Sequence, residues 1–219
     1  MQTKAYDVIV CGGGPAGIAA AVAAARNGAK TLLIEKNAFV GGCAASGLPF
    51  LNFFNRNRVQ VIRGVGEELV QRMQAEQAAL PHILPSGGQV DSITMIDPEW
   101  VKICAEQMLL ECGCALLYDS VVCACRVENG RLCAITVANK AGLTQLEAKC
   151  FVDATGDADL VYFAGGQFAQ GRDGGGDDLD VLASHRAVLA GMRVEIHQVL
   201  SDGDHVVMYS RRWLPGGGP

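Results

Sequence analysis

Glycines near the start of the chain have the residue type and spacing that bind a pyrophosphate. Residues 12–17 read Gly-Gly-Gly-Pro-Ala-Gly and match the pattern G-x-G-x-x-G. In this pattern Gly12 allows a tight turn, Gly14 lets the backbone approach the phosphates, and Gly17 lets a helix pack on a strand. A helix that begins here presents free N–H groups and a positive dipole end to the anion. The pattern predicts a dinucleotide site; the alternative is a glycine-rich turn that binds no nucleotide.

Glu35 supplies the second chemical feature of such a site. It ends the next predicted strand, at the distance of about 20 residues from the first glycine that is typical of this carboxylate. A carboxylate here holds the two hydroxyls of a ribose and repels a 2′-phosphate, but it does not distinguish FAD from NAD. Gly41 and Gly42 then begin a second loop of small residues that ends at Gly47. This loop gives an extended ligand room beside the first one.

The elements around these residues form the unit that the pattern requires. Residues 6–11 are a run rich in β-branched residues, which is typical of a buried parallel strand. A helix is predicted over 16–27, with Gly28 as its stop, and a second strand over 31–35. Strand, helix and strand in this order make a βαβ unit with a right-handed crossover. The glycines therefore lie where the first strand meets the helix, which is the context that makes the pattern specific.

Further elements follow the βαβ unit. An apolar stripe predicts a helix over 65–73, and Asp97-Pro98 is a typical start of another helix that ends near Gly113. The buried side of that second helix is expected to carry Trp100, Ile103, Cys104 and Met108. Residues 41–51 read as a loop and residues 80–92 as a surface excursion. Strand-like runs separated by turn signals then predict an antiparallel meander and a final strand, over 115–118, 121–127, 132–138, 143–152 and 150–154.

Composition limits what the protein can bind. Half of the 219 residues are hydrophobic, 19% are charged, and the net charge is −5. These values exclude a disordered acidic tail and give no basic excess for nucleic acid or an anionic membrane. Residues 8–25 carry no charge, but the glycines and proline among them argue against a membrane span. Nine cysteines without an evident secretory signal indicate free thiols in a reducing compartment, so we expect a cytoplasmic protein.

With these motifs the chain resembles the FAD-dependent oxidoreductases of the glutathione-reductase-like superfold. The matching residues are 7–17 (DVIVCGGGPAG), 35–36, 41–42, 97–99 and 152–159 (VDATGDAD). The match covers residues 5–171, and the combination is more specific than any single motif. The resemblance implies an α/β, Rossmann-like FAD-binding domain with a parallel sheet, crossover helices and an antiparallel β-meander. It also implies FAD as cofactor, a small-molecule substrate, and transfer of a hydride or two electrons between that substrate and the flavin.

The resemblance further implies roles for individual residues. The backbone of the first loop would cradle the pyrophosphate: Gly12, Gly14, Pro15, Ala16 and Gly17. Glu35 would bind the adenosine ribose, with Lys36 beside it. Gly41 and Gly42 would border the phosphate and ribityl region.

Three later positions complete the implied site. Val122 would offer backbone groups to adenine, although a plain core position accounts for it equally well. Gly156 would allow close approach near the pyrophosphate. Asp157 would hydrogen-bond nearby, and its alternative is an exposed acid that caps the next turn. No catalytic residue can be named from these patterns.

The cysteine patterns are weaker signals. In relatives that reduce disulfides, a Cys-x4-Cys pair lies under the flavin, whereas here Leu48 stands five positions after Cys43. This departure argues against thiol–disulfide reduction and leaves Cys43 as a small loop residue or a neighbour of the flavin ring. The Cys-x-Cys pairs at 112–114 and 123–125 lack the usual spacing of zinc ligands, so we expect buried cysteines and no metal.

The composition and the hydrophobic periodicity of the sequence change after Gly171. Residues 172–180 are mostly glycine and aspartate, and residues 182–199 show only weak helical periodicity. We therefore expect an FAD-binding domain over 1–171, with an excursion over 48–96, and a divergent, linker-like tail over 172–219. The late Gly-Asp segment of the family is not recognisable, because no small-residue helix follows Gly203-Asp204. We therefore expect the chain to be a truncated member of the family.

Two other functions remain open from the sequence. The first is a non-catalytic FAD-binding module whose site is completed by a second chain or a missing C-terminal domain. The second is a fragment of an NAD-binding dehydrogenase, since the glycine pattern and Glu35 serve both dinucleotides.

Overall fold

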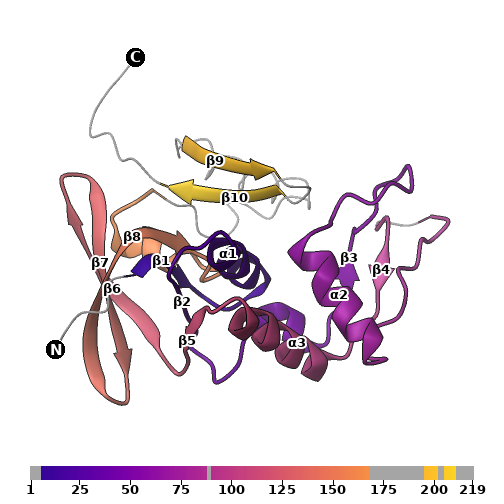
Figure 1. Cartoon of the computed structure of the whole chain (residues 1–219), viewed down its shortest axis with the longest axis horizontal. Helices are drawn as coiled ribbons and strands as arrows, with labels where there is room; N and C mark the ends of the chain where they lie inside the picture. Colours follow the sequence, from indigo (N-terminus) through magenta and orange to yellow (C-terminus); the bar gives the residue numbers. More distant parts are fainter. Residues whose placement is uncertain (1–5, 88–89, 168–194, 202–204, 211–219) are drawn as a thin grey trace, which may run out of the picture.

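A computed structural model describes residues 6–87, 90–167, 195–201 and 205–210 of the chain. Its centre is the predicted βαβ unit: β1 (Tyr6–Cys11), α1 (Pro15–Arg26) and β2 (Thr31–Ile34). The strands β1 and β2 pair in parallel with Val8 opposite Thr31. β1 also pairs in parallel with β8 (Gly142–Asp153), so the first strand lies in the middle of the sheet (Figure 1).

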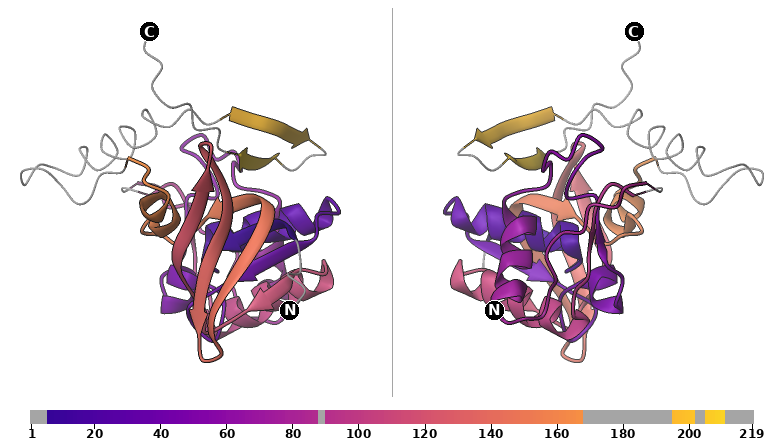
Figure 2. Two further views of the ribbon diagram at one scale, coloured as in Figure 1. Left: turned by 90° about the vertical axis from the view of Figure 1, so that its left-hand side faces the viewer. Right: turned by 90° about the vertical axis from the view of Figure 1, so that its right-hand side faces the viewer.

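The main sheet has six strands in the order β5-β2-β1-β8-β7-β6. β5 (Ala115–Leu117) extends its parallel half beyond β2. β6 (Val121–Glu128) and β7 (Arg131–Asn139) form the antiparallel meander with β8. Figure 2 shows these three long strands lying across the front of the parallel strands in its left-hand view. The architecture confirms the expected α/β class with a parallel sheet, a crossover helix and a meander.

Side chains along β1 and β2 point alternately to the two faces of the sheet, and each face packs into its own hydrophobic core. Val8, Val10 and Leu33 face α1, α2 (Val65–Ala75) and α3 (Pro98–Glu111). The intervening residues of β1 and β2 point to the other side and pack against the meander and α4 (Asp159–Phe163). The buried members of that second core are Ile9, Cys11, Leu32, Ile34, Val122, Ile135, Val137 and Leu160. Both faces of the parallel strands are therefore covered, as an apolar run without polar alternation requires.

The segment of residues 48–96 forms a lobe beside this sheet. It contains α2 and a two-stranded pair, β3 (Phe50–Leu51) with β4 (Ile93–Thr94), on the right-hand side of Figure 1. The described residues of 80–92 lie at the surface or are partly buried, as predicted, except Ser92 at the end of the segment. Ser92 is fully buried, and its hydroxyl accepts a hydrogen bond from the Phe54 N–H.

Some local predictions hold and others are wrong. Asp97 caps α3 as expected, since its carboxylate accepts a hydrogen bond from the Glu99 N–H at 2.8 Å. Ile103 was expected on the buried side of α3 but is 43% exposed, because Val101, Ala105 and Leu109 share that side with Cys104 and Met108.

The predicted strands 143–152 and 150–154 are one strand, β8, which changes from an antiparallel to a parallel neighbour along its length. The predicted loop 41–51 contains the 3-10 helix η1 (Gly42–Ser46) and β3.

The tail is described only over two strands. β9 (Glu195–Ser201) pairs antiparallel with β10 (His205–Ser210), so residues 195–199 are strand where weak helical periodicity was expected. The rest of the segment with weak helical periodicity, the Gly/Asp run and Gly203-Asp204 lie outside the described residues. Among the residues that the structure describes, no helix is long and apolar enough to cross a membrane. In the same part of the chain, no group of three or more His, Cys, Asp or Glu side chains is arranged to hold a metal ion.

Candidate functional site

The first glycine loop is held against the carboxyl end of β8 by backbone contacts. Gly12 has a φ of +105°, and its N–H donates to the Ile34 carbonyl at 2.8 Å. A Cβ on Gly12 would collide with the carbonyl group of Ala154, and a Cβ on Gly17 would collide with the carbonyl oxygen of Gly12. Neither position has room for a side chain, so both glycines are needed for the loop itself.

Gly14 differs from these two glycines because the space beside it is open. Its φ is −74°, and a Cβ added there would meet no atom within 4 Å. Gly14 is the N-cap of α1, where no side chain caps the helix and the first turn holds no acidic residue. Pro15 and Ala16 are exposed at the same place. The N–H groups at the start of α1 thus face open space with a positive dipole end, as an anion site requires.

The second glycine loop is joined directly to the first. The Gly41 N–H donates to the Gly13 carbonyl at 2.7 Å. A Cβ on Gly42 would lie 2.8 Å from the Cα of Gly14, so the two backbones approach each other more closely than side chains would permit. The expectation that the two loops are neighbours agrees with this geometry. Together they form a continuous surface of backbone, which we call the cradle (Gly12–Gly17 with Gly41–Gly42).

Glu35 lies beneath the cradle with its carboxylate engaged. It is 5% exposed; Oε2 accepts from the Gly13 N–H at 2.6 Å, and Oε1 accepts from the backbone and side-chain N–H groups of Asn37, each at 2.8 Å. A carboxylate has about four acceptor positions, so three bonds leave one for a ligand hydroxyl. Sequence reasoning missed the contact with Gly13. Glu35 was expected only to bind the ribose, but its carboxylate also holds the first glycine loop. Lys36 is exposed next to it.

The start of the meander lies beside Glu35. The Ser120 N–H donates to the Glu35 carbonyl at 3.1 Å, and Val122 follows two residues later in β6. The Val122 side chain is 8% exposed and packs in the core between meander and sheet. Its backbone pairs with Val137, and the register of the two strands shifts directly after it. The side chain is therefore core, while the role of its backbone toward adenine stays a prediction.

The turn after β8 lies against Gly12 and is held by Asp153 and Thr155, which belong to the matched motif but were given no role from the sequence. Asp153 Oδ1 accepts from the N–H and the hydroxyl of Thr155 at 3.1 and 2.8 Å, and Oδ2 accepts from the Val161 N–H at 2.9 Å. The Thr155 hydroxyl in turn accepts from the Asp159 N–H at 3.0 Å. The Asp-x-Thr spacing at the end of a strand was the available signal, because such side chains cap turns. Gly156, at a φ of +87°, and Asp157 are exposed on the outside of this turn.

The thiol of Cys11, which directly precedes the cradle, is buried. Burial, and secondarily the Asp153 carboxylate, raise the pKa of Cys11 well above its usual range. Burial likewise raises the pKa of Cys114 to about 12. A thiol that stays protonated is a poor nucleophile, so Cys11 contributes packing under Gly12. Cys43, in contrast, is exposed on η1, and all nine cysteines are free.

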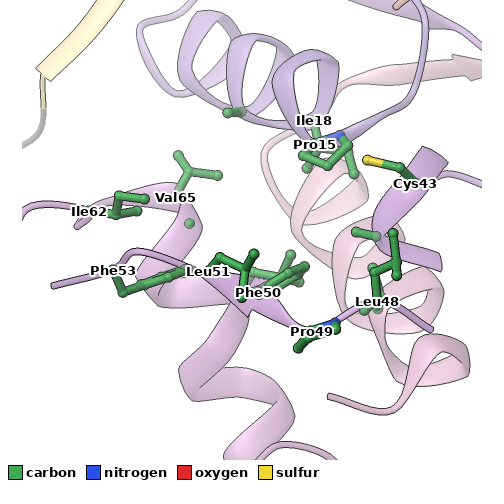
Figure 3. A pocket seen from close by; sticks show the side chains of 15 residues that line it. Pro15, Ile18, Cys43, Leu48, Pro49, Phe50, Leu51, Phe53, Ile62 and Val65 are labelled. Atoms are coloured by element: carbon green, nitrogen blue, oxygen red, sulfur yellow. The ribbon is translucent and has the colours of Figure 1, made fainter. Parts of the chain in front are cut away.

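An apolar pocket of about 420 Å³ opens next to the cradle. It lies between the first turns of α1, the segment that follows Gly42, and α2 (Figure 3). Pro15, Ile18, Cys43, Phe50 and Phe53 are among the residues that line it. Because these residues come from segments far apart in the sequence, no local pattern pointed to the pocket.

Comparison with known proteins agrees with this arrangement. A sequence model of the family described as FAD dependent oxidoreductase matches residues 7–212. A glycerol-3-phosphate dehydrogenase from Synechocystis is 38% identical over 88 residues, which are 34% of this chain and 16% of that protein.

Solved structures share the fold at low identity. A geranylgeranyl bacteriochlorophyll reductase-like protein from Thermoplasma acidophilum has a TM-score of 0.54 and 20% identity, over 74% of this chain and 42% of that one. The glycerol-3-phosphate dehydrogenase from Bacillus halodurans complexed with FAD has a TM-score of 0.50 and 19% identity, over 74% and 36% of the two chains. The present chain thus spans less than half the length of each of these proteins.

Proposed function

The chain belongs to the FAD-dependent oxidoreductase family, and we propose that its cradle and Glu35 bind FAD for two-electron oxidation or reduction of a small molecule. The observation that carries this proposal is the open, uncapped N-terminus of α1 at Gly14. The uncapped helix end beside three glycines has no side-chain partner for its first N–H groups, which leaves them available to water or to a ligand. A pyrophosphate supplies those partners and benefits from the helix dipole.

The described residues fit the pyrophosphate and adenosine part of the cofactor. The N–H groups at the start of α1, beside Gly14 and Gly42, would hold the pyrophosphate. Glu35 accepts hydrogen bonds from the adenosine ribose while its other contacts keep Gly13 in place. When bound, FAD supplies hydride or two-electron chemistry, and the protein's task is to bind and orient it. None of the described side chains is assigned as a proton donor or acceptor.

The remaining predicted contacts belong to this proposal. The backbone near Val122 lies on the Glu35 side of the cradle and is proposed to meet adenine. Gly156 and Asp157 lie on the turn whose preceding residue pair, Ala154-Thr155, touches Gly12, and they are proposed to lie near the pyrophosphate. Gly41 and Gly42 are proposed to border the phosphate and ribityl region. Lys36, exposed beside Glu35, is proposed to lie near the ribose.

The wider assignments are proposals as well. We propose a domain boundary near residue 171, with the 48–96 lobe as an excursion of the FAD-binding domain and 172–219 as a tail; the family match itself continues to residue 212. Limited proteolysis tests this boundary. The free thiols support a cytoplasmic location. A small molecule is the proposed substrate, and a second chain or further domain is proposed to cover the part of the site that the cradle leaves open.

The experiment is a cofactor titration of the purified 219-residue protein. We expect a yellow protein with a flavin absorbance band, and apoprotein whose melting temperature rises with FAD but not with NADH. Apoprotein that is stabilised by NADH and not by FAD would refute the proposal. FAD bound without reduction by any electron donor tested would favour the non-catalytic module that another chain completes.

A further inference from the structure

The apolar pocket beside the cradle has a uniform chemical character. Apart from the Cys43 thiol, every residue that lines it is apolar, including Ile18, Leu48, Phe50 and Leu69. A charged group placed there would lose its hydration without gaining an ion pair or a hydrogen bond. The pocket therefore favours an uncharged ligand with a hydrocarbon surface. Its volume of about 420 Å³ falls within the range of roughly 300–1,000 Å³ that small-molecule sites occupy.

One wall of the pocket is rigid. Phe53 is 5% exposed and stacks on the His82 ring with the centroids 4.8 Å apart. His82 is fixed on both sides, since Nδ1 lies 2.6 Å from the Thr94 hydroxyl and Nε2 lies 3.0 Å from the Glu67 carboxylate. Phe50 continues the aromatic wall with its ring 6.1 Å from that of Phe53. A preformed aromatic wall is a property of small-molecule sites, whereas surfaces for adaptable partners re-pack.

The pocket is continuous with the cradle. Pro15 lines the pocket and is the first residue of α1, directly after Gly14. Cys43 lines it from the other side and directly follows Gly42. Because Gly42 and Gly14 are in backbone contact, the cradle and the pocket share one edge. A ligand in the pocket would therefore lie beside a dinucleotide in the cradle.

We propose that this pocket binds the apolar part of an uncharged, largely hydrocarbon substrate. The inference rests on the proposed function, because it takes the cradle to hold the cofactor. It goes further in naming the substrate class, which excludes small carboxylates and phosphate esters. Exposed apolar side chains at the rim, Leu48 at 62% and Leu51 at 44%, extend the surface along which such a molecule lies.

The test uses Nile red, an uncharged apolar fluorophore, with the FAD-loaded protein. Nile red fluorescence is expected to rise on binding, and 1-decanol is expected to displace the dye at least tenfold better than decanoate of the same chain length. Leu48→Gln and Ala19→Leu are expected to weaken dye binding at least fivefold, because the first makes the rim polar and the second fills the pocket. Leu143→Gln is the matched control, since this leucine is 73% exposed on β8 and does not line the pocket.

Three results would overturn the proposal. Competition between FAD and Nile red would place the cofactor itself in the pocket. Equal binding by the pocket variants and Leu143→Gln would place the dye elsewhere. Oligomers that dissociate in Leu48→Gln would show that a second copy of the chain covers the pocket. Flavin absorbance of the same samples separates the two hypotheses, because protein that binds Nile red in the pocket but retains no FAD contradicts the proposed function alone.

Discussion

Replacing Gly14 with alanine is expected to change FAD affinity while leaving the stability of the fold almost unchanged. The backbone at Gly14 is extended, with φ −74° and ψ −179°, and the added Cβ meets no atom within 4 Å. Replacing glycine with alanine lowers the conformational entropy of the unfolded chain, which stabilises the protein by about 0.4–1 kcal/mol at a compatible site. Alanine is a poorer N-cap than glycine by a similar amount, since caps differ by about 0.5–2 kcal/mol. The two effects nearly cancel, so the free energy of unfolding is expected to change by less than about 1 kcal/mol.

The effect on FAD binding is expected to be much larger. The new methyl group occupies the space through which a phosphate reaches the N–H groups of α1. Loss of one hydrogen bond to a charged group costs about 1.5–3 kcal/mol. This corresponds to a dissociation constant raised roughly 10- to 150-fold, since each 1.4 kcal/mol is a factor of ten.

The assay compares Gly14→Ala and two other variants with the wild type, by urea unfolding without ligand and by FAD titration. Gly87→Ala is the matched control, because Gly87 also has open space for a Cβ and is remote from the cradle in sequence. Gly12→Ala is the opposite case, since its Cβ collides with Ala154 and its φ is +105°, and we expect it to destabilise the apoprotein itself. Unchanged FAD affinity in folded Gly14→Ala would refute the assignment of this helix end to the pyrophosphate.

Three further changes test the parts around the cradle. Glu35→Gln removes the charge that accepts from Gly13 and Asn37; urea unfolding should show a loss of about 1.5–3 kcal/mol, and FAD titration a weaker complex. An unaltered unfolding curve would mean that these bonds contribute nothing. Asp97→Ala removes the cap of α3 and should cost about 1 kcal/mol in the same assay, whereas Asp97→Asn should retain most of it. The hydrogen bond from Arg26 and the neighbouring Arg72 lower the pKa of Glu68, so its contribution to stability is present above the ordinary pKa of 4.5 and is lost as the pH falls below it. Thermal melts of wild type and Glu68→Gln should therefore converge on acidification, and a constant difference between them would contradict this linkage.

The parts of the fold that sequence reasoning predicted are those with local causes. The βαβ unit follows from an apolar run, a glycine pattern and a second apolar run, all within residues 6–34. Asp97 predicted its own helix start because an N-cap acts on the N–H groups two or three residues away. The two glycine loops were found for the same reason: backbone that must approach backbone needs glycine at that very position.

The parts that sequence reasoning missed have causes spread along the chain. Ile103 satisfies a helical stripe on α3, yet Val101 and Leu109 occupy the buried side because α1, α2 and η1 pack against α3 there. Nothing near Glu35 in the sequence reveals that its carboxylate bonds Gly13, since that contact depends on how β2 and the loop meet in space. The bend of β8 from the meander into the parallel sheet likewise depends on β1, a strand more than 130 residues earlier.

The cradle and the pocket therefore constrain the sequence in different ways. The cradle needs side chains to be absent at Gly12, Gly17 and Gly42, and a single added methyl group disturbs it. The pocket needs only apolar volume from α1, the segment after Gly42 and α2, and many combinations of aliphatic and aromatic residues supply that. Substitutions at Leu48 or Leu51 can consequently change which substrate fits while leaving the backbone of the cradle untouched. If the cradle binds the cofactor and the pocket the substrate, as proposed, cofactor binding and substrate choice depend on different residues, although the two sites share an edge at Pro15 and Cys43.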